Sequence, residues 1–394
     1  MPGVLLVTGA TVTAESAAPP GPCRDYLALA RALDAEVLDR AAVGRSPVGR
    51  LLARACGVPA AQAWLAFAQR SRHEVIVTDG EHVGIPLALL LKLARDRSVH
   101  VTIGHRLSSR KKRPFFRLLN VQSHIARIVV HSTLQLELAA HELRIEPKRL
   151  ALLPYHVDTD FWRPSSTPPE RLIVSAGLEH RDYPTLFRAV DGLDARVVIG
   201  AASHWSRRPN SAHACRPPPN VEIGAFDYVA LRALYDRAAV VVVPLVDVDF
   251  QAGVTTILEA MAMGTPVVAS QTRGQTDMVV DRRAVLRGAP TSVRSASLLQ
   301  QMSDGDGARL EPTGFYVPPG DAVTLRRALR YLLDHPVERA ELGAAGRRVA
   351  AQLLTTAQFA ERVAAVVRKA RAAQACQEGV AAAPLRPGVD QRRD

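Results

Sequence analysis

The strongest constraint on the fold of this 394-residue chain is the segment from Val240 to Asp277, which predicts a strand, a polar loop, a helix and a second strand in close succession. The apolar, β-branched run at its start is too short to span a membrane and is typical of a strand buried on both faces of a parallel sheet. Gly253 then precedes a stretch, Val254 to Met263, whose apolar residues recur at helical spacing before a glycine and a proline. The segment is one βαβ unit and predicts an α/β fold.

In such a unit, the loop after the strand and the first helical turn face the ligand crevice, where unpaired backbone N–H groups can hold an anion. Gly253 allows the backbone to approach that anion, and Val254 and Thr255 supply the first amides of the helix. Glu259, one to two turns into the helix, can accept hydrogen bonds from sugar hydroxyls. The alternative interpretation is a helix that carries one solvated glutamate.

The run LEAMAMGTPVVAS, residues 258–270, resembles the signature of the retaining nucleotide-sugar glycosyltransferases of family four, the glycosyl transferases group 1. The resemblance implies the GT-B fold: two Rossmann-like domains that face each other across a cleft, with a C-terminal helix that returns to the N-terminal domain. Members of the family usually carry two glutamates eight positions apart. Glu259 stands at the second position, and Gln251 stands at the first.

The length of the chain also favours two domains. We expect the linker in the Pro-rich segment 164–169. The predicted divisions are an N-terminal acceptor-side domain (1–163), a C-terminal nucleotide-sugar-binding domain (170–345), a helical segment that packs back on the first domain (346–375) and a disordered tail (376–394). Within the second domain, residues 282–312 are expected to form an insertion.

Composition excludes several other classes of protein. The net charge is +12, but only five of the fifty basic residues are lysine, and no stacking aromatics or helix-turn-helix pattern accompany them, so nucleic acid is not an expected partner. The four cysteines are far apart and form no metal or disulfide pattern, which favours a reducing cytoplasm. The sequence shows no basic leader with a sustained apolar region and no spanning segment.

Polar residues follow three predicted strands of the first half, at the edge where ligands of parallel sheets bind. Gly9 follows the first strand, and Glu81 and His82 follow the next; these three are the candidate acceptor-side residues. The alternative is that Asp79 or Glu81 caps the following helix. His105 resembles the histidine that lies near the sugar in several family members and is the candidate catalytic residue with Glu259, although a lone histidine can also be structural.

The resemblance implies further donor-binding residues in the second half. Arg181 stands where the family usually has a lysine, and its planar fork suits a diphosphate. The backbone of Gly224, Ala225 and Phe226 resembles the site that holds the nucleotide base. Arg273 lies in a segment that resembles the loop approaching the sugar and phosphates.

A basic, aromatic stretch from Arg106 to Leu119 has six basic residues and two phenylalanines in fourteen positions. It resembles the segment by which some relatives meet membranes or lipid-linked acceptors, and Arg106 to Phe116 is therefore a candidate for peripheral contact with an anionic membrane. The alternative is a solvated face with Phe115 and Phe116 in the core.

Together these features predict a metal-independent hexosyltransferase that moves a sugar from a nucleoside diphosphate sugar to a hydroxyl of a carbohydrate, lipid or small-molecule acceptor, with retention of configuration. The nucleotide sugar is a co-substrate, and no cofactor or metal is expected, because Asp247 and Asp249 have DxD spacing but fall in the donor loop. The alternatives are a GT-B nucleotide-sugar epimerase or phosphorylase, which product analysis would distinguish, and a non-catalytic sugar-nucleotide-binding protein.

Overall fold

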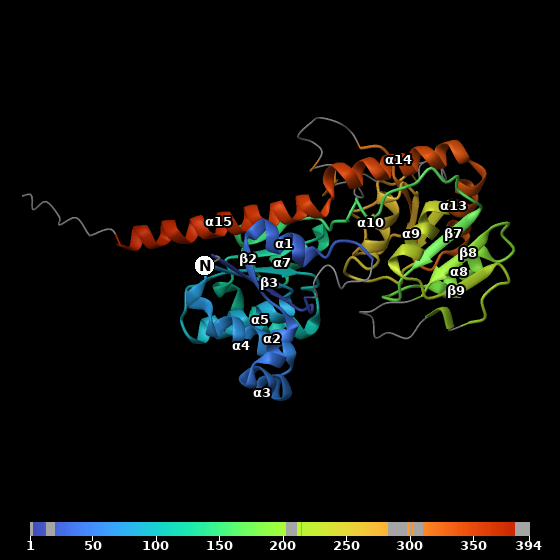
Figure 1. The fold of residues 1–394 in the computed structure, drawn as a ribbon. Helices are drawn as coiled ribbons and strands as arrows, with labels where there is room; N and C mark the ends of the chain where they lie inside the picture. Colours follow the sequence, from blue (N-terminus) through green and yellow to red (C-terminus); the bar gives the residue numbers. More distant parts are fainter. Residues whose placement is uncertain are drawn as a thin grey trace, which may run out of the picture.

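The computed structural model describes residues 3–12, 20–201, 211–213, 215–282, 298–299, 302 and 310–382, which fold into two α/β bodies (Figure 1). Each body is built on a six-stranded parallel sheet. The predicted GT-B architecture of two Rossmann-like domains is confirmed.

The N-terminal sheet has the strand order β2-β1-β3-β4-β5-β6, and every pair of neighbours is parallel. β1 lies at the point where the order reverses, since the chain adds β2 on one side of it and β3 on the other. The strands are β1 (Val4–Thr8), β2 (Ala35–Leu38), β3 (Val75–Asp79), β4 (Val99–Gly104), β5 (Arg127–Val130) and β6 (Leu150–Leu152).

The C-terminal sheet has the order β12-β11-β10-β7-β8-β9 and is also parallel throughout. Its reversal lies between β7 and β10. All four residues of β10 are buried, which confirms the prediction of a strand covered on both faces. The strands are β7 (Leu172–Ala176), β8 (Arg196–Gly200), β9 (Val221–Gly224), β10 (Val240–Val243), β11 (Val267–Ser270) and β12 (Gly314–Val317).

Helices cover both faces of each sheet, and several begin at a side chain that accepts from the amide three residues later. These caps are Asp39, Ser46, Ser132, Asp182, Asp227 and Asp321. The N-terminal body contains α1 (Asp25–Leu33), α2 (Arg40–Arg45), α3 (Pro47–Cys56), α4 (Val58–Ala68), α5 (Glu81–Leu93), α6 (Arg113–Arg117) and α7 (Thr133–His141). The C-terminal body contains α8 (Tyr183–Val190), α9 (Tyr228–Arg237), α10 (Val254–Ala262), α13 (Ala322–Asp334) and α14 (Pro336–Leu353).

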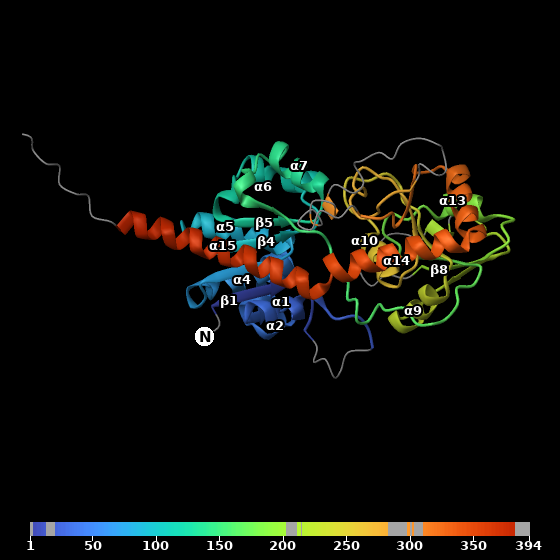
Figure 2. The same cartoon turned by 90° about the horizontal axis from the view of Figure 1, so that it is seen from above.

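The last helix, α15 (Thr356–Ala382), returns to the N-terminal body, as predicted. Figure 2 shows α14 and α15 following one another along the two bodies. Val349 and Ala350 of α14 belong to the core around α10, whereas Phe359 and Val363 of α15 pack with β-strand residues of the N-terminal sheet. One chain segment therefore contributes to both hydrophobic cores.

The chain passes between the two bodies twice, near Val157 and again near Leu354. These two segments lie side by side and are joined by backbone hydrogen bonds. The amide of Val157 donates to Leu354 at 2.8 Å, and the amide of Thr356 donates to Val157 at 3.1 Å. Trp162 is already packed in the C-terminal core. We therefore propose that the domain boundary lies near Val157, ahead of the Pro-rich segment 164–169.

The helix predicted from Val254 to Met263 is observed as α10, which ends one residue earlier, at Ala262. The helix α15 continues past Cys376 to Ala382, into the segment predicted as a tail. The remainder of that tail and most of the predicted insertion at 282–312 lie outside the described residues.

Candidate active site

The first turn of α10 lies at the carboxyl edge of the C-terminal sheet, where the strand order reverses and ligands of such sheets bind. Gly253 precedes it with φ +74° and no side chain caps the helix. A Cβ at Gly253 would lie 2.6 Å from Val243 Cγ1 and 3.0 Å from Arg181 Nη1, so any other residue would clash as well as strain the backbone. The uncapped amides and the helix dipole make this turn an anion site.

Arg181 lies directly beneath this turn and is only 5% exposed. Its Nε donates to Ala176 O at 2.8 Å, its Nη1 to Glu179 O at 3.1 Å and its Nη2 to Thr256 Oγ1 at 3.1 Å. Burial lowers the pKa of Arg181 from its ordinary value, but the guanidinium stays charged at neutral pH. No carboxylate of the described residues forms an ion pair with it, so a buried cation is left without an anionic partner.

Glu259 lies further along α10, partly buried, with the Tyr235 hydroxyl donating to its Oε2 at 3.4 Å. Burial raises the pKa of Glu259 to about 8, against the lowering effects of that hydrogen bond and of the Arg181 charge. At neutral pH the carboxyl therefore holds its proton in the free protein. A protonated carboxyl can donate one hydrogen bond to a sugar hydroxyl and accept another.

A cleft of about 500 Å³ joins these groups. Arg181, Gly253, Thr255 and Glu259 all line it, and the ring of Phe226 closes the side near β9. The structure does not bring every predicted donor residue to the cleft wall, since Gly224 and Ala225 are not among the lining residues and the Val254 side chain is buried in the core. The other lining residues are Pro20, Arg24, Ala176, Gly177, Leu178, Glu179, Gly200, Asp227, Tyr228, Leu231 and Thr256.

The two remaining donor candidates have different surroundings. Gln251 is 7% exposed, and both polar atoms of its amide lack a hydrogen-bond partner among the described residues. Arg273 is exposed and paired with Asp247, to which its amide donates at 2.9 Å and its Nε at 3.2 Å. Of the two, only Gln251 has a buried amide with unused donors and acceptors. Because buried polar groups normally have hydrogen-bond partners, this amide is a candidate for contact with a ligand.

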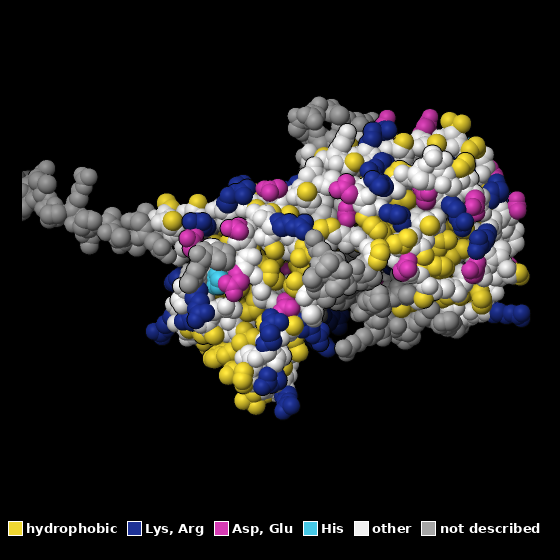
Figure 3. All heavy atoms as spheres, viewed as in Figure 1, with side chains coloured by type: hydrophobic (Ala, Val, Ile, Leu, Met, Phe, Trp, Pro, Cys, Tyr) yellow, Lys and Arg dark blue, Asp and Glu magenta, His cyan; other side chains and the backbone are white. Residues whose placement is uncertain are grey.

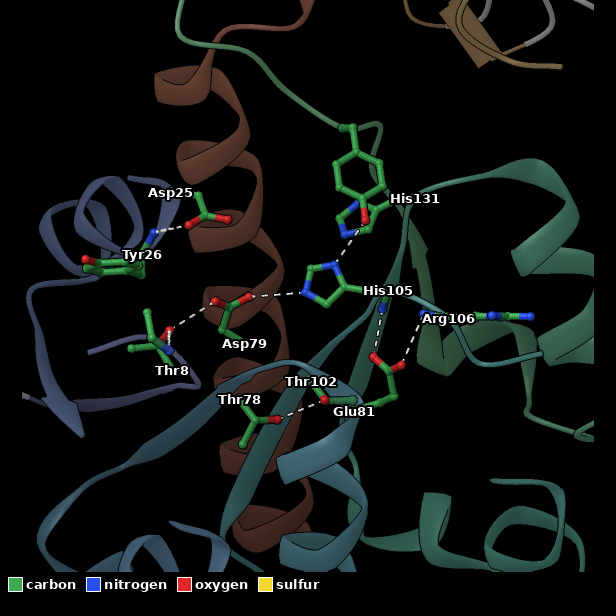
Figure 4. A network of polar contacts seen from close by, with 12 residues as sticks. Thr8, Asp25, Tyr26, Thr78, Asp79, Glu81, Thr102, His105, Arg106 and His131 are labelled. Atoms are coloured by element: carbon green, nitrogen blue, oxygen red, sulfur yellow. Dashed lines mark hydrogen bonds and ion pairs between the residues drawn. The ribbon is translucent and has the colours of Figure 1, made fainter. Parts of the chain in front are cut away.

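His105 lies at the end of β4, in the N-terminal body, within a polar network (Figure 4). Its Nε2 is 3.4 Å from Asp79 Oδ1, and its Nδ1 is 3.1 Å from the Tyr155 hydroxyl. Burial disfavours the charged ring, but Tyr155, Asp79 and Glu81 outweigh this effect and raise the pKa of His105 well above 6.5. For Asp79 burial is likewise outweighed, and the hydrogen bond and charge of His105 lower its pKa.

Glu81 is buried and holds the loop that carries His105. Its carboxylate accepts from the amide of His105 at 2.9 Å and from the amide of Arg106 at 3.2 Å (Figure 4). The same carboxylate also pairs with Lys112. Burial alone would raise the pKa of Glu81, but Lys112 and His105 lower it to about 2. The Glu81 carboxylate therefore holds the backbone of the loop that carries His105. It does not cap α5, because no side-chain hydrogen bond caps that helix, and its contact with an acceptor remains a prediction.

The other acceptor-side candidates, Gly9 and His82, lie together. A Cβ at Gly9 would come within 3.0 Å of the His82 Nε2, and the His82 side chain is exposed. Burial lowers the pKa of His82, against the raising effects of Glu81 and Asp79. This pair therefore lies beside the His105 network, at the ends of β1 and β3.

Asp25, Asp79 and Tyr155 complete this network but were not identified as site residues from the sequence. Asp25 lies near Asp79 at the start of α1, where burial and the Asp79 charge raise the pKa of Asp25 to about 6 (Figure 4). The position of Asp79 at a strand end was a usable signal. Asp25 and Tyr155 gave none, because both reach the site only through the packing of distant segments.

Half of the six basic residues in the stretch from Arg106 to Leu119 form ion pairs within the protein. Arg106 pairs with Asp249, Lys112 with Glu81 and Arg113 with Glu142. Phe116 is buried, and Phe115 packs against the same core. The remaining basic residues, Arg110, Lys111 and Arg117, are exposed.

Comparison with known proteins agrees with this geometry. Residues 181–335 match the family model described as glycosyl transferases group 1. The chain is 26% identical over 308 residues to the MMP alpha-(1->4)-mannosyltransferase of Mycolicibacterium hassiacum, covering 73% of this chain and 66%, just under two thirds, of that relative. Its fold is similar to sucrose-phosphate synthase from Thermosynechococcus elongatus (TM-score 0.64, 18% identity, covering 94% of this chain and 99% of that one). It is also similar to Anabaena HepE in complex with UDP-glucose (TM-score 0.62, 13% identity, covering 93% and 99%).

Two parallel six-stranded sheets joined by a returning C-terminal helix give this chain the GT-B fold, which it shares with these solved structures. Over residues 181–335 the chain therefore resembles the glycosyl transferases group 1 family.

The His105–Asp79 pair gives a testable pH dependence. Because the folded pKa of His105 is raised, its contribution to stability is complete below about pH 6.5 and is lost as the pH rises through the folded value. We expect Asp79→Asn to lower the pKa of His105 by at least about one unit, as removal of a close opposite charge does. NMR titration of the imidazole signals checks this, and an unchanged His105 titration in the variant would contradict the pairing.

Proposed function

We propose that this chain transfers a hexosyl group from a nucleoside diphosphate sugar to an acceptor hydroxyl, with retention of configuration. The observation that carries the proposal is the position of Arg181, which is buried beneath the uncapped first turn of α10 and pairs with no carboxylate of the described residues. Of the five N–H donors of a guanidinium, three are used within the protein, so two remain for a diphosphate. The amides of Thr255 and Thr256 face the same ligand.

This arrangement suits the bond that must break. Negative charge develops on the diphosphate as the glycosidic bond lengthens, and a buried cation with oriented amides stabilises that charge without reorganisation. Glu259 binds the ribose hydroxyls from the next turns of α10, and Phe226 contacts the base from the opposite wall. Gln251 then contacts the sugar itself, where its amide can donate and accept.

The acceptor side is assigned to the His105 network. The two ring nitrogens of His105 contact Asp79 and Tyr155, and the raised pKa favours the positively charged ring at the carboxyl end of β4. Gly9 and His82 lie together beside this network, and we assign them to the acceptor side as well. Closure of the bodies over the donor would exclude water that otherwise hydrolyses it.

The role of Arg181 can be tested with conservative variants. We expect Arg181→Lys to weaken nucleoside diphosphate binding about tenfold or more, equivalent to about 1.4 kcal/mol, because the ammonium keeps the charge but loses the fork. Arg181→Ala should in addition lose about 1–3 kcal/mol of stability, since it leaves buried acceptors unpaired. Isothermal titration with UDP, GDP and ADP measures affinity, and Arg188→Lys, an exposed arginine on α8, is the matched control. Unchanged affinity in Arg181→Lys would refute the assignment.

Gln251 allows a second test, on turnover. A glutamate at this buried position would have to hold a charge without a cationic partner, whereas the neutral amide does not. We expect Gln251→Glu to lower turnover or change donor preference. Higher turnover in the variant would instead show that the wild-type glutamine marks a decayed position, and identical kinetics across several donors would show that residue 251 does not contact the sugar.

Metal independence remains a prediction. The two carboxylates with DxD spacing form ion pairs with different arginines, Asp247 with Arg273 and Asp249 with Arg106. They are therefore not directed at a common point where a metal ion would bind. We expect transfer to be unchanged in EDTA. Activity that is abolished by EDTA and restored by magnesium or manganese would overturn this expectation.

We further propose that the protein acts in the cytoplasm and contacts anionic membrane through the end of α6. There Arg110, Lys111 and Arg117 are exposed beside Leu118, which is 80% exposed, and Leu119. None of the helices in the described part of the chain has the length and hydropathy needed to span a bilayer. Elsewhere, basic side chains are dispersed among acidic and apolar ones over the visible face (Figure 3).

Vesicle flotation tests the membrane contact. Each basic residue near an anionic surface contributes about 1 kcal/mol, so three can give salt-sensitive binding. We expect flotation with phosphatidylserine vesicles at low salt and none with neutral vesicles, and the double variant Lys111→Glu, Arg117→Glu should not float. Failure of the wild-type protein to bind phosphatidylserine vesicles at low salt would overturn the contact.

A further inference from the structure

The donor loop of the C-terminal body is held by a buried side chain of the N-terminal body. Gln135, on α7, is 2% exposed. Its Oε1 accepts from the amide of Leu107 at 2.8 Å, and its Nε2 donates to the carbonyl of Asp249 at 2.9 Å. One amide group therefore joins the loop after His105 to the loop that carries Gln251.

Arg106 makes a second contact with the donor loop, at Asp249 and at the following Phe250. Its Nη2 is 3.4 Å from Asp249 Oδ1, and its guanidinium carbon lies 4.2 Å from the centre of the Phe250 ring. Asp249 and Phe250 immediately precede Gln251. The N-terminal body thus fixes both the backbone and the side chains of the segment that positions Gln251.

The first turn of α7 makes a further contact across the two bodies. Asp277 is 1% exposed, and its carboxylate accepts from the amide of Thr133 at 2.9 Å and from its hydroxyl at 2.8 Å. Thr133 and Gln135 are on the same helical turn. This contact docks α7 against the C-terminal body at a point separate from the donor loop.

On the acceptor side, the loop from His105 to Leu107 has its three amides held in sequence. Glu81 accepts from the first two, and Gln135 accepts from the third. Any movement of Gln135 relative to the C-terminal body therefore displaces the contact to Asp249 while the His105 loop stays attached to its own domain.

We propose that Gln135 is a positioning residue that couples closure of the two bodies to the arrangement of the donor loop. When the bodies are closed, its hydrogen bond to Asp249 holds Gln251 toward the donor sugar, and the same side chain holds the loop of His105. When they open, the donor loop loses this restraint. The effect on transfer rests on the proposed function, whereas the effect on loop order does not.

The amide is required because it donates to one domain and accepts from the other. A glutamate at this position would still accept from Leu107, but it would present a second acceptor to the Asp249 carbonyl and break only the contact between domains. A leucine would break both contacts. Comparing Gln135→Glu with Gln135→Leu therefore separates the coupling from the local support of the His105 loop.

Hydrogen exchange of the free protein is the primary test. We expect Gln135→Glu to speed exchange of the amides in 246–252 by about tenfold, as loss of one restraining hydrogen bond allows, and to leave exchange of 103–108 unchanged. Gln135→Leu should speed both segments. His141→Gln, an exposed change on the same helix, is the control and should alter neither.

Kinetics with UDP-glucose, GDP-mannose and ADP-glucose provide the second measurement. With the donor that the wild-type protein uses best, Gln135→Glu should lower kcat about tenfold, change the donor KM less than twofold and increase the fraction of donor hydrolysed rather than transferred. A purely structural role would instead lower the unfolding midpoint and leave that fraction unchanged.

The outcomes separate the inference from the proposed function. Unchanged exchange of 246–252 in Gln135→Glu overturns the inference, whatever the kinetics show. Faster exchange with unchanged kcat and hydrolysis overturns its role in the reaction. If the wild-type protein uses none of the donors, the proposed function fails, and the exchange result alone decides whether Gln135 fixes the donor loop.

Discussion

The proposed donor site depends on one charge, the guanidinium of Arg181, which pairs with no carboxylate of the described residues. Burying such a cation is costly, and the carbonyl and hydroxyl groups that accept its hydrogen bonds offset part of this cost. The N-terminus of α10 is the positive end of the helix dipole, so it adds to the charge of Arg181, and both favour an anion. Gly253 is part of the same arrangement, because a larger residue would collide with Arg181 itself. The Arg181 charge, Gly253 and the uncapped first turn of α10 therefore depend on one another.

The second half of the site is organised around a charge that is compensated. His105 and Asp79 stabilise each other's ionised forms, and Glu81 with Lys112 holds the loop that positions the histidine. In the proposed function, the C-terminal body therefore offers unmatched positive charge to the donor, and the N-terminal body offers an internally balanced network to the acceptor. The contacts of Arg106 and Gln135 with the donor loop bring the two halves together.

The elements that could be predicted from the sequence are those set by local patterns. The buried run at β10, the glycine before α10 and the helical spacing after it predict the βαβ unit. The placement of Arg181, Gly253 and Glu259 in one cleft follows from that unit and from the resemblance to a known family. Local patterns determine these features because strands, helix ends and positive-φ glycines depend on neighbouring residues.

The features that could not be predicted depend on distant segments. The burial of Arg181, the pairing of Asp25 with the His105 network and the bridge from Gln135 to Asp249 join residues that are far apart in the chain. The basic stretch illustrates the same limit, because its composition suits a lipid surface while half of its charges pair with carboxylates elsewhere in the protein. Periodicity and motif spacing carry no signal for such contacts.

The most direct test of the central claim is an amide NMR spectrum of the protein titrated with a nucleoside diphosphate and, separately, with the matching monophosphate. If the diphosphate binds between Arg181 and the first turn of α10, the signals of the Thr255 and Thr256 amides and of the Arg181 Nε–H should shift strongly with the diphosphate and little with the monophosphate. Saturable binding of the diphosphate that leaves those three signals in place would contradict the claim.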